Sequence, residues 1–249
     1  MNDNYKLSRE KGMDEKDLKA TRDFYESVNN VWPVNNPWHD VSQKEIREEI
    51  SKLSIQVNNI KVLNAGSGGN DYNLKCNMYN IDVVAGVNSS LPNFTLGSIE
   101  QMPYDNCFFD IIICVGSVIN YCDAAKSISE FSRVLKSNGL LILEFESSYG
   151  YEYLHTDAYM KNVAKVTCQY LGKEHRLWVY SPKYISNLLK CNNFCIRKQN
   201  QFHILSSYMY SKRKDENKSA KFAKYDVFLK HIPYIKNHSS NIIYKCQKQ

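Results

Sequence analysis

Between residues 60 and 146, short apolar runs alternate with longer polar segments of helical length. A short apolar run bounded by turn residues is typical of a buried strand, and apolar residues three or four positions apart are typical of a helix. The pattern predicts strands over residues 60–65, 82–87, around 94–96, 110–116 and 140–146. It predicts helices over residues 70–79 and 124–136.

The run at residues 110–116 is apolar on both of its faces. Strands of this kind, separated by crossovers, indicate a parallel sheet that helices cover on both sides. After residue 146 the pattern predicts further strands over residues 165–171, 175–181, 195–210 and 240–247, and helices over 182–190 and near 219–231. The expected fold class is therefore α/β, with a doubly wound, mostly parallel seven-stranded sheet.

Two helices are predicted before the first strand, over residues 17–28 and 41–53. Ser42 is expected to cap the second helix, because Glu45 three residues later completes a capping box. Residues 31–40 between them contain two prolines and two tryptophans and are expected to form a structured loop. Residues 1–20 are polar and are expected to fray or to form a loose first helix.

These elements divide the chain into two expected parts. Residues 1–55 form an N-terminal helical cover, and residues 56–249 form the Rossmann-like α/β domain. The domain carries a tyrosine-rich insertion near residues 149–180 and a basic helical segment near 211–232.

Length and composition restrict the class of protein. A chain of 249 residues, 43% of them hydrophobic, is long enough for one sizeable core. The polar N-terminus has no apolar signal region, and the longest apolar stretch, residues 107–119, is too short to cross a bilayer, so a cytoplasmic protein without a membrane partner is expected. The eight cysteines include no Cys-x-x-Cys pair, which predicts neither a zinc site nor a disulfide framework.

The net charge of +6 is unevenly distributed. Residues 172–230 hold thirteen Lys and Arg against four Asp and Glu, and the densest part is residues 211–224. Two interpretations stay open: a solvated helix face, or a clamp for an anionic substrate or a nucleic acid.

The segment KVLNAGSGGN, residues 61–70, runs from the first predicted strand into a glycine turn. In a doubly wound sheet, ligands bind beyond the carboxyl ends of the strands, so this loop is the first candidate for a ligand site. Glycines let the backbone approach a ligand closely. No Gly-Lys-Ser or Gly-Lys-Thr follows, so the loop is not a P-loop.

Two further segments make the pattern specific: GSIEQMPYDNCFFDIIICVGSVINYC, residues 97–122, and EFSRVLKSNGLLILEF, residues 130–145. Together with the glycine loop they resemble class I S-adenosylmethionine-dependent methyltransferases of the small-molecule, type 11-like kind. The resemblance implies a Rossmann-like methyltransferase fold and S-adenosylmethionine as the cofactor, and no metal. It extends in order over about residues 20–200.

The chain departs from this family at three positions that usually carry an acid. Asn64 replaces the acid of the glycine loop, Asn88 the ribose-binding acid after the second strand, and Ser98 the aspartate near the adenine. Asp71, Asp82 and Glu100 lie nearby and could substitute. The cofactor-binding residues that the resemblance implies are Asn64, Ala65, Gly66, Ser67, Gly68, Asn88, Ser89, Ser98, Ile99 and Val115.

Acceptor-side residues are expected after the fourth and fifth strands and in the N-terminal cover. The candidates for catalysis are His155 as a general base, Tyr121 and Tyr25. No amino-group or cytosine DNA-methyltransferase motif is present, which favours N- or O-methylation of a small metabolite. A catalytically degenerate partner protein and an RNA or protein methyltransferase remain alternatives, and nothing in the sequence indicates the oligomeric state.

Overall fold

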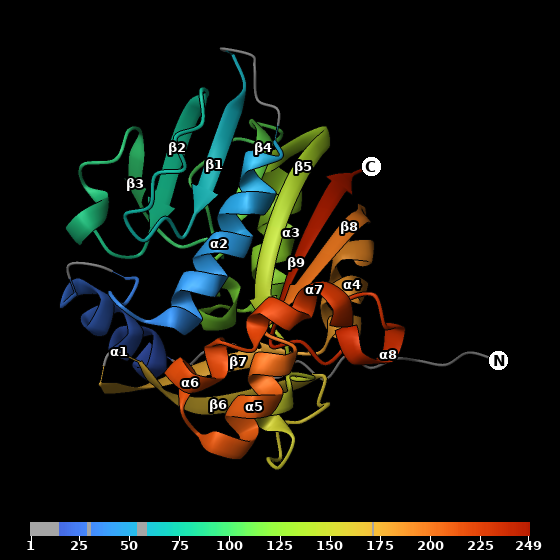
Figure 1. Ribbon diagram of the computed structural model, residues 1–249. Helices are drawn as coiled ribbons and strands as arrows, with labels where there is room; N and C mark the ends of the chain where they lie inside the picture. Colours follow the sequence, from blue (N-terminus) through green and yellow to red (C-terminus); the bar gives the residue numbers. More distant parts are fainter. Residues whose placement is uncertain (1–14, 29–30, 54–58, 171) are drawn as a thin grey trace.

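The computed structural model describes residues 15–28, 31–53, 59–170 and 172–249, so residues 1–14, which were expected to fray, lie outside the described part. Its centre is a seven-stranded sheet of order β3-β2-β1-β4-β5-β9-β8 (Figure 1). β9 is antiparallel to both neighbours, and the other pairs are parallel, which confirms the predicted doubly wound, mostly parallel sheet. Its strands are β1 Lys61–Ala65, β2 Asn77–Asp82, β3 Phe94–Leu96, β4 Phe109–Cys114, β5 Leu135–Glu146, β8 Phe194–Phe202 and β9 Asn241–Lys248.

Helices and a separate hairpin surround the sheet. The hairpin pairs β6 Val163–Tyr170 with β7 Lys173–Tyr180. The α-helices are α1 Glu15–Glu26, α2 Pro37–Ser51, α3 Ala124–Val134, α4 Pro182–Cys191, α5 Leu205–Arg213, α6 Glu216–Ala220, α7 Asp226–Leu229 and α8 Pro233–Lys236. The 3-10 helices are η1 Gly86–Asn88, η2 Val118–Tyr121, η3 Tyr151–Tyr153 and η4 Ala223–Tyr225.

The central strands β1 and β4 are buried on both faces, as their continuous apolar runs predicted. Ile112 of β4 belongs to a core with Ile128 and Phe131 of α3, whereas its neighbours Ile111 and Ile113 belong to a second core on the α2 side. α2 lies on one face of the sheet, and α3 and α4 lie on the other (Figure 1). The carboxyl edge of the parallel strands stays free of these layers and faces α1, the β6–β7 hairpin and α5 to α6 (Figure 1).

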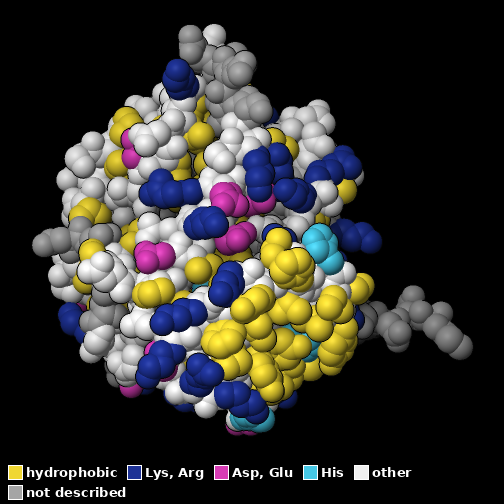
Figure 2. All heavy atoms as spheres, viewed as in Figure 1, with side chains coloured by type: hydrophobic (Ala, Val, Ile, Leu, Met, Phe, Trp, Pro, Cys, Tyr) yellow, Lys and Arg dark blue, Asp and Glu magenta, His cyan; other side chains and the backbone are white. Residues whose placement is uncertain are grey.

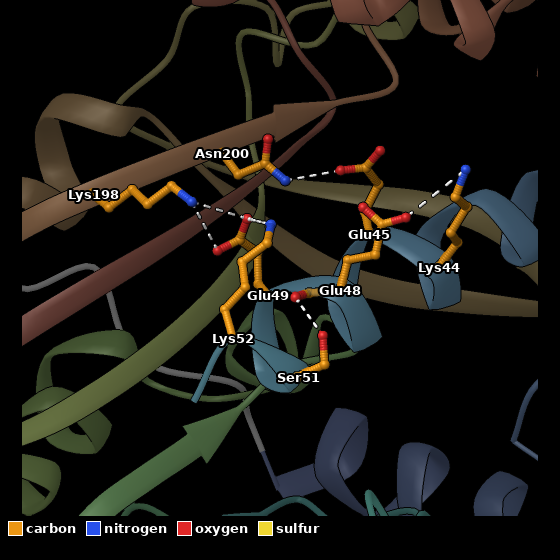
Figure 3. Close-up of polar contacts among 8 residues, drawn as sticks. All are labelled: Lys44, Glu45, Glu48, Glu49, Ser51, Lys52, Lys198 and Asn200. Atoms are coloured by element: carbon orange, nitrogen blue, oxygen red, sulfur yellow. Dashed lines mark hydrogen bonds and ion pairs between the residues drawn. The ribbon is translucent and has the colours of Figure 1, made fainter. Parts of the chain in front are cut away.

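Polar contacts hold α2 against β8. Glu49 of α2 is buried between Lys52 of the same helix, at 2.7 Å, and Lys198 of β8, at 3.4 Å (Figure 3). Asn200 of β8 donates to Glu45 at 2.8 Å. Although burial opposes it, the two ammonium groups hold the pKa of Glu49 below its ordinary value. The carboxylate is therefore stabilised in its ionised form.

We expect Glu49→Gln to lower the free energy of unfolding near neutral pH by about 1–2 kcal/mol, because it removes the carboxylate between two ammonium groups. The depressed pKa means that this contribution is present above the ordinary pKa of 4.5 and is lost as the pH falls below it. Glu48→Gln is the matched control, since Glu48 is 50% exposed and 3.8 Å from Lys44. Urea unfolding at neutral and acidic pH measures both, and equal losses for the two variants would contradict the role of Glu49.

The second strand lies five residues earlier than the sequence predicted, and the helix predicted over residues 70–79 is absent from that described segment. Asn80 of β2 is directly opposite Asn64 of β1, which donates to it at 3.0 Å. These two buried asparagines, which are hydrogen-bonded to each other, interrupt the apolar pattern on which the prediction depended. Residues 83–87 follow the strand instead of forming it.

The bounds of two predicted helices and one predicted strand were also wrong. α2 begins at Pro37, four residues before the predicted start, because the side chain of Asn36 accepts from the N–H groups of Trp38 and His39. Ser42 lies inside this helix, 3.0 Å from the His203 ring. The strand predicted over 195–210 ends at residue 202, and the helix predicted near 219–231 is divided into α6, η4 and α7.

Candidate functional site

A cavity of about 1210 Å³ lies at the carboxyl edge of the parallel strands. The loops after β1, β2, β4 and β5 line it on the sheet side, and α1, the β6–β7 hairpin, α5 and α6 line it on the other side. This volume exceeds the roughly 300–1,000 Å³ of an ordinary small-ligand site. The cavity is thus large enough for two ligands side by side.

The glycine loop enters this cavity at Gly66, directly after β1. Gly66 has a φ of +74°, and a Cβ there would lie 2.5 Å from Cγ2 and 2.9 Å from Cβ of Val118. Its N–H and that of Ser67 donate to the carbonyl of Ile81 in β2, at 2.8 and 3.2 Å. Position 66 therefore admits only glycine, because the loops after β1 and β4 touch there.

Asp82, the last residue of β2, is one of the three nearby acids that the sequence offered as substitutes for the missing ones. It lines the cavity and accepts hydrogen bonds from the N–H groups of Gly68, at 2.8 Å, and Val84, at 3.0 Å. Burial raises the pKa of Asp82, and the backbone N–H groups oppose that rise. The sequence prediction treated residue 82 as the start of a strand, so it looked for the acid after the second strand at Asn88.

Asn88 and Asn64 maintain the shape of the glycine loop. Asn88 is 1% exposed, and its side-chain oxygen accepts from Ser67 Oγ and from the N–H of Gly69, both at 2.7 Å. The Asn64 side chain donates to the carbonyl of Asn70 and to Asn80, both at 3.0 Å. An acid at position 64 could not donate, so this departure from the family belongs to the loop's internal hydrogen bonding.

The structure brings most, but not all, of the predicted cofactor residues together. Those that line the cavity are Gly66, Gly68, Asn88, Ser98, Ile99 and Val115. Those that lie outside its lining are Asn64, Ala65, Ser67 and Ser89. Ser98 Oγ accepts from the N–H of Glu100, whose carboxylate in turn accepts from the N–H of Asp123 at 2.8 Å. Glu100 is thus engaged in shaping the loop before α3.

Carboxyl groups from β5 and η3 also line the cavity. Glu144 is buried and accepts from the N–H of Ser117, at 2.6 Å, and from Asn241, at 2.7 Å. Glu146, two residues later, points to the same face of β5, and burial followed by repulsion from Glu144 raises its pKa to about 7. Burial raises the pKa of Glu152 to about 8. The signal that could have revealed them is two acids, two positions apart, in an otherwise apolar strand.

Tyrosines surround these carboxyl groups. Tyr25 and Tyr121, two predicted catalytic residues, line the cavity and are hydrogen-bonded to each other, and burial raises the pKa of Tyr25 to about 12. Tyr153 and Tyr170 also line the cavity. His155, the predicted general base, is exposed and is not among the lining residues. The structure therefore separates His155 from the cavity and places carboxyl groups there instead.

The N-terminal segment covers the glycine loop. Trp32 Nε1 donates to the Asn70 side chain at 3.0 Å, and the Tyr170 hydroxyl donates to the carbonyl of Val31. Phe24 of α1 packs edge-on against His175 of β7, with ring centroids 4.0 Å apart. These contacts connect the cover to both the loop and the hairpin.

The charge of the lining is predominantly acidic. Among the described residues that line the cavity, three are basic: Arg22, Lys165 and Lys214. Eight are acidic: Asp82, Glu100, Glu144, Glu146, Glu152, Asp157, Asp215 and Glu216. No group of three His, Cys, Asp or Glu in the described residues is arranged to hold a metal ion. Nor is any helix in these ranges long and apolar enough to cross a bilayer.

Comparison with known proteins connects this site to a chemistry. The family model described as a methyltransferase domain matches residues 63–143, from β1 into β5. The ubiquinone/menaquinone biosynthesis C-methyltransferase UbiE of Campylobacter jejuni (strain 81-176) is 26% identical over 171 residues, which are 66% of this chain and 67% of that protein.

Solved structures share the fold over nearly the whole chain. Geranyl diphosphate C-methyltransferase from Streptomyces coelicolor A3(2), in complex with Mg²⁺, geranyl diphosphate and S-adenosyl-L-homocysteine, superposes with a TM-score of 0.62 at 10% identity, covering 93% of this chain and 98% of that one. The 1,6-didemethyltoxoflavin-N1-methyltransferase of Burkholderia thailandensis gives a TM-score of 0.54 at 10% identity, covering 93% and 87%. At such identity the likeness concerns the fold alone.

Proposed function

We propose, from the premise that this chain is a class I S-adenosylmethionine-dependent methyltransferase, that it methylates a small, largely apolar acceptor without a strong negative charge. The observation that carries the proposal is a single cavity whose lining combines two sets of residues. The first part of the lining has the glycine loop and Asp82, and the second part has Glu146 and tyrosines.

The residues of the first part suit the cofactor. S-adenosylmethionine supplies an electrophilic methyl group when it is bound. Gly66 lets the loop after β1 pack directly against Val118, which keeps the glycine loop and the loop after β4 together at the cavity. The Asp82 carboxylate would accept hydrogen bonds from ribose hydroxyls, which are stronger than those to a neutral acceptor. Asp82 thus provides an acid after the second strand, which weakens the hypothesis of a degenerate site.

The residues of the second part suit an acceptor that loses a proton. A carboxylate whose pKa is close to neutral is well matched to accept a proton at neutral pH. We assign that role to Glu146, with Tyr25 and Tyr121 orienting the acceptor and the N-terminal cover excluding water. The acidic lining disfavours a phosphorylated acceptor, because like charges repel strongly in a partly buried cavity.

The acceptor atom that we propose is carbon, in place of the nitrogen or oxygen that the sequence favoured. Two of the relatives described above are C-methyltransferases by name. Nitrogen methylation is the second candidate, because the Burkholderia neighbour is an N1-methyltransferase. Incubation with methyl-labelled S-adenosylmethionine and a panel of hydroxylated aromatic, unsaturated prenyl and nitrogen-heterocyclic compounds, followed by fragmentation mass spectrometry that locates the methyl group, distinguishes the two. A methyl group found on nitrogen or oxygen would contradict carbon methylation.

Calorimetric titration with S-adenosylhomocysteine tests the cofactor site directly. We expect micromolar binding by the unaltered chain and a loss of about tenfold to a hundredfold in Asp82→Asn, since that substitution removes charge-assisted hydrogen bonds. Asp71→Asn is the matched control, because Asp71 is an exposed acid of the same loop and is not among the lining residues. No binding at millimolar ligand would contradict the cofactor site, and equal affinity of the two variants would contradict the role of Asp82.

A further inference from the structure

An apolar patch is exposed on the outer side of the segment between β8 and β9. It consists of Tyr208, Tyr225, Val227, Phe228, Ile232 and Tyr234. Phe228 and Tyr234 are 71% and 74% exposed. Figure 2 shows hydrophobic side chains gathered without interruption over the region where Figure 1 draws α5, α7 and α8. Large continuous apolar surfaces of this kind mark sites where a protein binds something.

The patch is bordered by basic side chains. Residues 205–238 contain eight Lys and Arg against three Asp and Glu, and one of those acids, Asp226, is buried. Dark blue side chains lie beside the yellow patch in Figure 2. Lys224 lies 5.1 Å from the Tyr225 ring and Lys212 lies 5.6 Å from the Tyr208 ring, so positive charge is adjacent to the apolar surface.

Buried contacts keep this segment folded while its apolar side chains remain exposed. The Asp226 carboxylate accepts hydrogen bonds from the N–H groups of Ile204 and Leu205, both at 2.9 Å, which joins α7 to the start of α5. His238 stacks on Tyr151 with ring centroids 5.0 Å apart. The exposure of Phe228 and Tyr234 therefore belongs to a defined surface.

The charges indicate what covers this surface. In a symmetric dimer built on this patch, the same basic border would face itself, and like charges would repel. An anionic lipid surface presents the opposite charge to the border and an apolar interior to the aromatic side chains. Between a second copy of the chain and an anionic lipid surface, only the lipid is complementary in charge to the basic border.

We infer that the apolar patch and its basic border dock this protein on the surface of an anionic lipid bilayer. The docking would be peripheral, with Phe228 and Tyr234 inserted among the headgroups. α5, α6 and the turn between them also contribute Tyr210, Glu216 and Lys214 to the cavity wall, so the docked face would adjoin the site where the acceptor binds. The inference goes beyond methyl transfer and contradicts the expectation of no membrane partner.

Sedimentation with lipid vesicles tests this inference without cofactor or acceptor. The full chain is mixed with phosphatidylcholine vesicles that either contain or lack phosphatidylglycerol. We expect binding to the anionic vesicles that weakens with added salt, and little binding to the neutral ones. The double variant Phe228→Ser/Tyr234→Ser should bind the anionic vesicles with an affinity lower by about tenfold or more. Leu96→Ser, an exposed apolar position on β3 at the far edge of the sheet, should bind like the unaltered chain.

Three results would overturn the inference. The first is absence of binding to anionic vesicles, and the second is binding that the double variant retains. The third is a concentration-dependent dimer in analytical ultracentrifugation that the double variant abolishes, since the patch would then join two copies of the chain. Because both substituted side chains are mostly exposed, the thermal midpoint of the variant should match that of the unaltered chain, which separates lost docking from lost folding.

Discussion

Gly66→Ala is expected to lower the free energy of unfolding by about 2–5 kcal/mol and to remove measurable binding of S-adenosylhomocysteine. Two effects add. An alanine at a φ of +74° is strained, and its Cβ would lie within 3 Å of the Val118 side chain. The loop after β1 and the loop after β4 would have to separate, and both of them line the cavity.

Gly172→Ala is the matched control for this prediction. Gly172 has nearly the same φ, +76°, but a Cβ there would meet no atom within 4 Å. It should therefore lower the free energy of unfolding by the backbone strain alone, about 1 kcal/mol. The double variant Gly66→Ala/Val118→Ala should recover part of the lost stability. Urea unfolding and calorimetry measure both quantities, and equal losses in the two single variants would show that Val118 does not restrict position 66.

Glu146→Gln is expected to lower the rate of methyl transfer by about 10²–10⁴-fold, with the affinity for S-adenosylhomocysteine changed by less than a few-fold. In the unaltered enzyme the rate should rise with pH through about 7, where Glu146 loses its proton, and this rise should be absent from the variant. Glu152→Gln is the matched control. Burial raises the pKa of Glu152 to about 8, so the Glu152 carboxyl group is mostly protonated near neutral pH. A glutamine side chain, which is also uncharged, resembles this protonated group.

The same variant has a readout that needs no acceptor. Because the folded pKa of Glu146 lies above its ordinary value of 4.5, its contribution to stability is complete below that value and is lost as the pH rises to about 7. Glu146→Gln should therefore be more stable than the unaltered chain at mildly alkaline pH, by about 1–3 kcal/mol, and similar to it near pH 4.5. A difference in stability that is the same at every pH would contradict the raised pKa.

Most of the sheet could be predicted from the sequence because its strands are apolar on both faces. β1, β3, β4, β5 and β9 begin and end within a few residues of their predicted bounds, apart from an earlier start of β5. α4 was predicted from a local signal, Ser181 followed by a proline, and the Ser181 side chain does accept from the N–H of Tyr184. Such signals depend only on neighbours in the chain.

Other features required partners that are distant in sequence. β2 is a strand because Asn80 pairs with Asn64 across the ladder, which the hydrophobic pattern does not encode. Because of that displacement, the sequence placed Asp82 at the start of the strand instead of at its end. Glu146 and Glu152 are separated from Tyr25 by more than a hundred residues, and they face one cavity because the strand order brings their loops to the same edge.

The sequence by itself determined the seven-stranded fold, the glycine loop and the resemblance to S-adenosylmethionine-dependent methyltransferases, because periodicity and short motifs are local properties of the chain. The tertiary structure alone decided which acids line the cavity, that His155 lies outside it, and that the basic segment borders an exposed apolar patch. Burial and proximity between distant residues decide these features, and both arise only when the strands take their order in the sheet.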